Sequence, residues 1–436
     1  MTLVAEVTVI APIPSGTMLR FLWQISLLLL LAVVLGRLAV RCRLPALAGE
    51  LSAGVLLGPS VLGALWPGLG EALAFGQPQQ QHLLEAVGQV GVLLLVGITG
   101  MHVDLGLARG RSATVSKVSA AGFVLPFAIG IPVALCIPAA LVPDGADRAT
   151  FALFIGIVLG ISAIPVIART LLDMDLLHRD IGQLTMCAVM LNDTAGWVLL
   201  AVVSGIATAG LHAHTLLTTA AGLLAAVAGA LLLRPLARSV LRRTTGGGPT
   251  TGVVCVLVLL GATGTQALGL EAVFGAFVVG LVLSHGRLVR MELLVPLRTT
   301  VLAVLSPVFF ALAGLRMDLT SLAHWPVLAT GAVVLIAAVV GKFAGAYLGA
   351  RLSRLSHWEG LALGAGMNAR GVVEIVIAMV GLRLGLLSPE IYTVVVLIAI
   401  VTSLMAPPVL RWAMARVTET EAETSRSARL HLNTTR

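Results

Sequence analysis

Two polar residues, Asn192 and Asp193, lie at the centre of an apolar stretch that is long enough to cross a membrane. A carboxylate at the middle of a membrane helix costs roughly 2.5–3.5 kcal/mol on insertion scales, so by default it marks an ion, proton or substrate site. Asn192 adds a neutral oxygen of the kind that hard cations accept as a ligand. The pair predicts a site where Asp193 holds either a proton or a transported Na⁺ or K⁺. The alternative is a structural role, in which Asp193 hydrogen-bonds to neighbouring helices and holds them together.

Besides Lys117, which is close to the end of its span, four further charged residues lie within apolar segments. Lys342 is one of only two lysines in the chain. A lysine can change its protonation state where an arginine cannot, so we interpret Lys342 as a charge partner of the site, either structural or competing for the carboxylate. Arg370 and Glu374 are four residues apart, which predicts a pair on one helix face with a structural or a functional role. Glu50 lies among glycines suited to close packing, so we expect it to support the core or line a pore.

Two apolar segments are interrupted in ways that free backbone carbonyls. The first contains Ser162 and Pro165, and the second contains the run Gly-Met-Asn-Ala-Arg-Gly at 366–371. Proline removes an intrahelical hydrogen bond, and Ser162 can help to satisfy the carbonyls that are freed. A common proline kink would explain the first segment alone. Two broken segments in corresponding halves instead indicate a transport site at the membrane midplane, with Ser162 as a ligand and Pro165 as core support.

The composition is that of a polytopic helical membrane protein. Of the 436 residues, 58% are hydrophobic and 11% are charged, whereas soluble chains carry about 25% charged residues. The net charge of +8 comes from basic residues in short loops between apolar segments. Orientation of the protein in the membrane explains these residues better than nucleic-acid binding does. The four cysteines stand at no metal-ligand spacing. With no phosphate loop and no clustered metal ligands, we expect neither an enzyme nor a cofactor.

About 20 apolar residues cross a bilayer, and this rule predicts thirteen spans. The predicted spans are 22–40, 44–63, 83–103, 114–138, 150–170, 180–206, 214–236, 250–268, 270–286, 297–315, 324–350, 358–383 and 388–411. If the N-terminus lies outside, 21 arginines fall in cytoplasmic loops or the tail and four fall outside. This positive-inside bias predicts a multi-pass protein of the cell membrane with a cytoplasmic C-terminus.

The spans divide into two sets of six around a linker helix, and the second set begins on the opposite side, so the repeats are inverted. The predicted units are an extracytoplasmic segment 1–21, a transmembrane domain 22–411 and a disordered cytoplasmic tail 412–436. Within the transmembrane domain they are a first repeat 22–206, a linker 214–236 and a second repeat 250–411.

Six motifs in order resemble the monovalent cation/proton antiporters of the second superfamily branch, including plant exchangers and bacterial relatives. They are residues 48–60, 162–169, Asn192-Asp193 with the following Gly-Trp, 274–281, Gly341-Lys342 and 366–374. The resemblance covers about residues 22–411. It implies a homodimer in the lipid bilayer, with a dimerisation domain and a six-helix core in which two discontinuous helices cross.

The resemblance also implies roles for two residues. The acid at the position of Asp193 binds cation or proton, and a lysine like Lys342 pairs with an acid at the centre. Many bacterial relatives carry two adjacent acids where this chain has Asn192-Asp193. The single acid in this chain favours exchange of one cation for one proton. We expect no nucleotide-binding regulatory domain of the kind that glutathione-gated relatives carry. The alternative functions are a channel-like potassium efflux protein, a solute efflux transporter or a non-transporting sensor.

Overall fold

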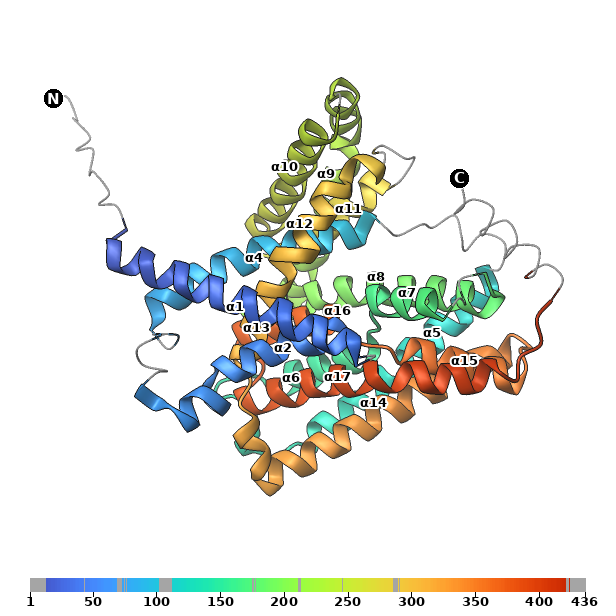
Figure 1. Cartoon of the computed structure of the whole chain (residues 1–436). Coiled ribbons are helices and arrows are strands. Elements are labelled where there is room, and N and C mark those ends of the chain that lie inside the picture. Colours follow the sequence, from blue (N-terminus) through green and yellow to red (C-terminus); the bar gives the residue numbers. More distant parts are fainter. Residues whose placement is uncertain are drawn as a thin grey trace.

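The computed structural model describes residues 13–420 and 423, except 43, 69–72, 74, 76, 102–111, 175, 177, 211–212, 245, 285–288 and 290. Over these residues the chain is entirely helical, and no strand occurs in them (Figure 1). The predicted all-α architecture is therefore confirmed. Most of the N-terminal segment predicted at 1–21 lies outside the described residues, and the first helix already begins at Ser15.

The first half of the chain contains α1 (Ser15–Arg41), α2 (Ala46–Leu57), η1 (Pro59–Gly63), α4 (Pro78–Met101), α5 (Ser112–Leu135), η3 (Ala139–Leu141), α6 (Arg148–Gly160), α7 (Ile164–Asp173), α8 (Asp180–Ala209) and α9 (Ala213–Arg243). The second half contains α10 (Gly247–Ala267), α11 (Ala272–Ser284), η4 (Met291–Leu294), α12 (Val295–Thr300), η5 (Val301–Leu305), α13 (Ser306–Leu315), η6 (Leu319–Ala323), α14 (Trp325–Leu352), α15 (His357–Met367), α16 (Val372–Arg383) and α17 (Pro389–Met414).

Ten of the described helical segments are long and apolar enough to cross a membrane, and the bent pair α15 and α16 makes up to eleven. The predicted spans at 150–170 and 270–286 fall on the shorter apolar helices α6 and α11. A tight turn separates α10 from α11, as the sequence predicts, and Gly269 permits it with a φ of +75°. The count of thirteen spans stays a prediction.

The helices pack in two groups. In one group α5 packs on α14, α6 and α8, while α15 packs on α14, α17 and α8, and α16 packs on α17. We call this group the crossing group, because it contains both interrupted helices. In the other, which we call the flanking group, α2 packs on α1 and α13, and α4 packs on α11 and α13. Figure 1 shows α14, α15 and α17 side by side in orange and red.

Glycines set the closest approach in the flanking group. A Cβ at Gly54 of α2 would lie 1.8 Å from the carbonyl oxygen of Ala311, and one at Gly314 of α13 would lie 2.0 Å from that of Leu51. Neither position can hold a side chain unless the two helices separate. Membrane helices have no hydrophobic driving force between them, and small residues at such contacts let them pack closely.

The C-terminal segment is partly ordered, contrary to the disorder predicted for 412–436. Helix α17 continues to Met414, and the carboxylate of Glu423 accepts a 2.6 Å hydrogen bond from the amide of Asp180, the first residue of α8. Arg179, the N-cap residue of α8, provides no side-chain cap and lies 3.4 Å from Glu423. Glu423 therefore caps α8 from a distant part of the chain. Residues 421, 422 and 424–436 lie outside the described residues.

Burial alone would raise the pKa of Glu423. The amides of Thr420 and Asp180 and the Arg179 guanidinium outweigh it and hold that pKa below its ordinary value of 4.5. The carboxylate is therefore charged at neutral pH. A depressed carboxyl pKa contributes stability above the ordinary value, and this contribution is lost as the pH falls through the depressed one.

The glycine contact predicts opposite effects for one substitution at two helical positions. Gly54→Ala should destabilise the protein by about 2 kcal/mol, because the helices must separate or the side chain must clash. Gly264→Ala in α10 meets nothing within 4 Å and should be neutral or stabilising by up to about 1 kcal/mol. Thermal unfolding in detergent measures both variants. Equal unfolding temperatures for the two would contradict the packing described.

The Glu423 cap predicts a pH-dependent loss of stability. Glu423→Gln should cost about 1 kcal/mol at pH 7, because α8 loses a charged cap at its N-terminus. The difference from the parent protein should shrink in strongly acid solution, where the parent's carboxylate is also protonated. The control is Glu390→Gln in α17, a helix that Ser388 already caps. Unfolding followed at several pH values tests this, and a difference that grows on acidification would overturn it.

Candidate functional site

The two interrupted helices meet at their breaks. Helix α6 ends at Gly160 and α7 begins at Ile164, while α15 ends at Met367 and α16 begins at Val372 after a bend of 47°. The hydroxyl of Ser162 donates to the carbonyl of Met367 over 2.7 Å, and the amide of Ala163 donates to the carbonyl of Ala369 over 3.2 Å. Each break therefore satisfies backbone groups that the other one frees.

The carbonyls at the end of α6, which have no partner within the helix, accept hydrogen bonds from two cationic side chains. Arg370 donates to the carbonyls of Val158 at 2.6 Å and Leu159 at 2.7 Å, and the ammonium of Lys342 donates to the carbonyl of Gly160. Both cations are almost completely buried. The C-terminus of a helix carries partial negative charge, so these contacts stabilise an α6 end that lies away from water.

An acid lies at the start of α16. Glu374, in its first turn, accepts a hydrogen bond from Arg370 over 3.0 Å. A negative group near a helix N-terminus is favourable. The predicted pair is present, but not on a helix face, because Arg370 precedes the helix. Gly371 between them has a φ of +155°, and a Cβ there would lie 2.6 Å from the side chain of Val166, so this N-cap position requires glycine.

Asp193 and Asn192 lie beside this crossing in the middle of α8. Both are fully buried. Neither carboxylate oxygen of Asp193 accepts a hydrogen bond within the part of the chain that the structure describes. Its favourable neighbours are the backbone amide of Ile164, at the start of α7, and the positive charge of Lys342. A buried carboxylate with such incomplete pairing is costly, so a bound proton or cation would stabilise it.

The amide of Asn192 joins three helices. Turned so that both of its ends are satisfied, it donates to the carbonyl of Ser119 in α5 at 3.0 Å and to the hydroxyl of Ser119 at 2.7 Å. Its oxygen then accepts from the Lys342 ammonium of α14 at 3.3 Å. Lys342 forms no ion pair with Asp193 among the described contacts. The direct pairing implied by the resemblance is therefore not present in this structure, because Lys342 contacts Gly160 and Asn192 instead.

Two other predicted residues have different places. Pro165 is the second residue of α7, where its missing N–H costs nothing. The break therefore precedes the proline, and the side chain of Pro165 lies outside what the structure describes. Glu50 lies on α2, with its Cγ against Gly36 of α1. No recorded contact joins Glu50 to the crossing.

Three side chains at the crossing were not predicted from the sequence. Ser119 binds Asn192, and Ser403 of α17 donates to the carbonyl of Arg370. Asn368, in the second break, is fully buried, and neither its oxygen nor its nitrogen has a hydrogen-bond partner within the described residues. Single hydroxyl residues in apolar helices carry no distinguishing pattern, whereas Asn368 stood inside the recognised 366–374 motif.

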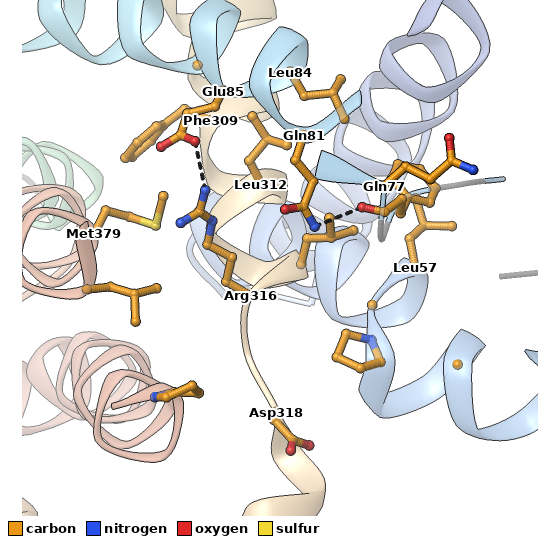
Figure 2. Close-up of a pocket in the computed structure, with 18 of the residues that line it drawn as sticks. Leu57, Gln77, Gln81, Leu84, Glu85, Phe309, Leu312, Arg316, Asp318 and Met379 are labelled. Atoms are coloured by element: carbon orange, nitrogen blue, oxygen red, sulfur yellow. Dashed lines mark hydrogen bonds and ion pairs between the residues drawn. The ribbon is translucent and has the colours of Figure 1, made fainter. Parts of the chain in front are cut away.

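A cavity of about 1080 Å³ opens at one end of the helix packing (Figure 2). It is lined by the end of α2 and η1, by α4 and α13, and by α16 and the start of α17. Glu85 and Arg316 form a 3.1 Å ion pair in its wall, and Phe309 and Met379 face it (Figure 2). Neither Asp193 nor any other predicted site residue lines this cavity. The predicted ion-binding residues therefore lie at the crossing and not in this cavity.

Comparison with known proteins agrees with this architecture. The antiporter MjNhaP1 from Methanocaldococcus jannaschii, solved at pH 8, superimposes with a TM-score of 0.69 at 16% identity, covering 92% of this chain and all of that one. This likeness shows a shared fold.

Sequence relatives extend over most of the chain. The Na⁺/H⁺ antiporter NhaS4 of Synechocystis is 31% identical over 400 residues, covering 90% of this chain and 97% of NhaS4. Cation/H⁺ antiporter 17 of Arabidopsis thaliana is 29% identical over 88% of this chain and 47% of its own. The K⁺/H⁺ antiporter 1 of Saccharomyces cerevisiae is 27% identical over 90% of this chain and 46% of its own.

The chain thus spans about half the length of the plant and yeast relatives and nearly all of NhaS4. A family profile described as "Sodium/hydrogen exchanger, transmembrane" matches residues 26–416. The chain therefore belongs to the transmembrane sodium/hydrogen exchanger family.

Proposed function

We propose that this protein is a secondary active transporter that exchanges a monovalent cation, Na⁺ or K⁺, for H⁺ across the cell membrane. The observation that carries the proposal is Asp193, fully buried next to two interrupted helices, with neither carboxylate oxygen hydrogen-bonded among the described residues. The names of NhaS4 and of the plant and yeast relatives, all cation/proton antiporters, support the same chemistry.

The reaction is competition at one carboxylate. Asp193 holds a proton or a cation, never both, because either one neutralises the charge that burial makes costly. The hydroxyl of Ser162 donates to Met367 and keeps its lone pairs as acceptors, so it can add a neutral oxygen for the cation. Asn192, which the sequence suggested as a ligand, holds Lys342 and Ser119 in place and so positions the site.

The proposed membrane arrangement has thirteen crossings, with α6–α7 and α11 counted as crossings in addition to the long helices. The inverted repeats are 22–206 and 250–411, linked by α9, with the N-terminus outside and the C-terminus in the cytoplasm. The flanking group forms the interface of a homodimer in the bilayer. The crossing group moves against it to give alternating access. The two packing groups support this division.

We propose that one cation exchanges for one proton, because Asp193 is the one acid of the Asn192-Asp193 pair. The ion pair of Arg370 and Glu374 carries no net charge. No net charge then crosses the membrane in a cycle.

Removal of the carboxylate tests the central residue. In proteoliposomes with an imposed pH gradient, Asp193→Asn should lower cation-dependent proton flux at least a hundredfold, because the amide can neither release a proton nor neutralise a cation. Asp144→Asn changes an exposed loop acid and should keep parental flux. Assays with Na⁺ and K⁺ in turn identify the cation. Full flux in Asp193→Asn would refute the site, and flux without proton coupling in the parent would indicate a channel.

The stoichiometry predicts that the rate is insensitive to voltage. Moving one net charge across the membrane changes the free energy by about 2.3 kcal/mol per 100 mV. The driving force of an electrogenic cycle would therefore depend strongly on the membrane potential. With the pH gradient fixed, an imposed potential of about 100 mV should alter the exchange rate less than twofold. A rate that follows the potential would exclude one-for-one exchange.

The two lysines give a matched pair. Lys342→Met leaves the carbonyl of Gly160 without its buried donor, so it should cost about 1–3 kcal/mol of stability and reduce exchange. Lys117→Met removes an exposed contact with the carbonyl of Leu352 and should change stability by less than about 0.5 kcal/mol. Thermal unfolding and flux per folded protein report both effects. Equal stability of the two variants would contradict the proposed role of Lys342.

A further inference from the structure

The cavity of Figure 2 lies where the two packing groups meet. Leu312 and Arg316 of the flanking group line one side, and Met379 and Leu382 of the crossing group line the other. Met379 is five residues beyond Glu374 on α16, about 7.5 Å along the helix axis. The cavity therefore ends a short distance from the helix crossing, although none of the crossing residues lines it.

A fully buried tyrosine lies behind this end of the cavity. The hydroxyl of Tyr392 on α17 donates to the carbonyl of Ala313 on α13 over 2.8 Å and lies 3.2 Å from the sulfur of Met379. Ala313 adjoins the cavity residue Leu312, and Met379 is itself a cavity residue. The Tyr392 hydroxyl therefore links α17 of the crossing group to α13 of the flanking group.

The next residue of α17 makes a second link at the same level. The hydroxyl of Thr393 accepts a 3.0 Å hydrogen bond from the amide of Asp318, just after α13. Two consecutive residues of α17 therefore hydrogen-bond to backbone groups in α13 and just after it. We call these two hydrogen bonds the α13–α17 clasp. If the groups move apart here, both bonds must break.

We infer that Tyr392 is a positioning residue that acts as a gate, closing the path from this cavity to Asp193 through the α13–α17 clasp. A cation or proton entering from the cavity passes when the clasp opens and Tyr392 leaves Ala313. The function of this gate rests on the proposed exchange, but its opening and closing can be measured without transport. Its ordinary alternative is a buried tyrosine whose hydroxyl is satisfied by packing and which never moves during transport.

Accessibility separates the gate from plain packing. Val376, one turn deeper on α16 than Met379, is 1% exposed. With the four native cysteines replaced by alanine, Val376→Cys should react slowly with a membrane-impermeant maleimide added from the cavity side. Adding Tyr392→Phe should speed labelling about fivefold, because a typical buried hydrogen bond no longer favours the closed state. The matched control is Tyr347→Phe, which changes the only other tyrosine, bonded to His357 at 3.0 Å, and should leave labelling unchanged.

Transport measured on the same variants keeps the two proposals distinguishable. Faster labelling in Tyr392→Phe without exchange in any variant would support the gate and refute the antiporter. Exchange in the parent with unchanged labelling in folded Tyr392→Phe would overturn the gate. If Tyr392→Phe does not fold, Thr393→Val removes the other bond of the clasp. Labelling in that variant should then rise two- to fivefold, and labelling at the parental rate would overturn the gate equally.

Discussion

The structure depends on how the end of α6 is neutralised inside the membrane. A helix that ends in the interior leaves carbonyls without partners, and no water is there to hydrogen-bond with their partial negative charge. Arg370, in the second break, and Lys342, on α14, donate hydrogen bonds to these carbonyls. Removing either cation would leave backbone oxygens unsatisfied, so the interruption is possible only because α14 and the second break supply the donors.

This arrangement leaves the Asp193 carboxylate available for the exchange that we propose. Lys342 is engaged by Gly160 and Asn192 and Arg370 by α6 and Glu374, so neither cation forms a salt bridge with Asp193. A direct ion pair would satisfy the carboxylate permanently and leave little gain for a transported ion. Asn192 contributes by holding Lys342 at one side, which keeps positive charge near the site without closing it. The neutral residue beside Asp193 therefore has a structural task that its position in the sequence did not reveal.

The sequence predicted the fold class, the two interruptions and the residues at their centre, because lipid imposes strong rules on apolar length and on buried charge. It did not predict how these residues pair. Arg370 and Glu374 were expected on one helix face, but the helix begins only after Gly371, and a break cannot be placed to the residue from composition. Pro165 was expected to interrupt the helix, and it is the second residue of α7, directly after the break, where proline disfavours a helical turn on its N-terminal side. The partners of Lys342 come from residues 160 and 192, and such long-range contacts leave no local pattern.

The central claim is that one carboxylate holds either a proton or a cation. Its most direct measurement is proton release from purified protein in weakly buffered detergent solution as Na⁺ or K⁺ is added. At a pH where Asp193 is protonated, the parent should release close to one proton for each cation bound, and Asp193→Asn should release none. Cation binding without proton release in the parent, or equal release in both proteins, would contradict the account.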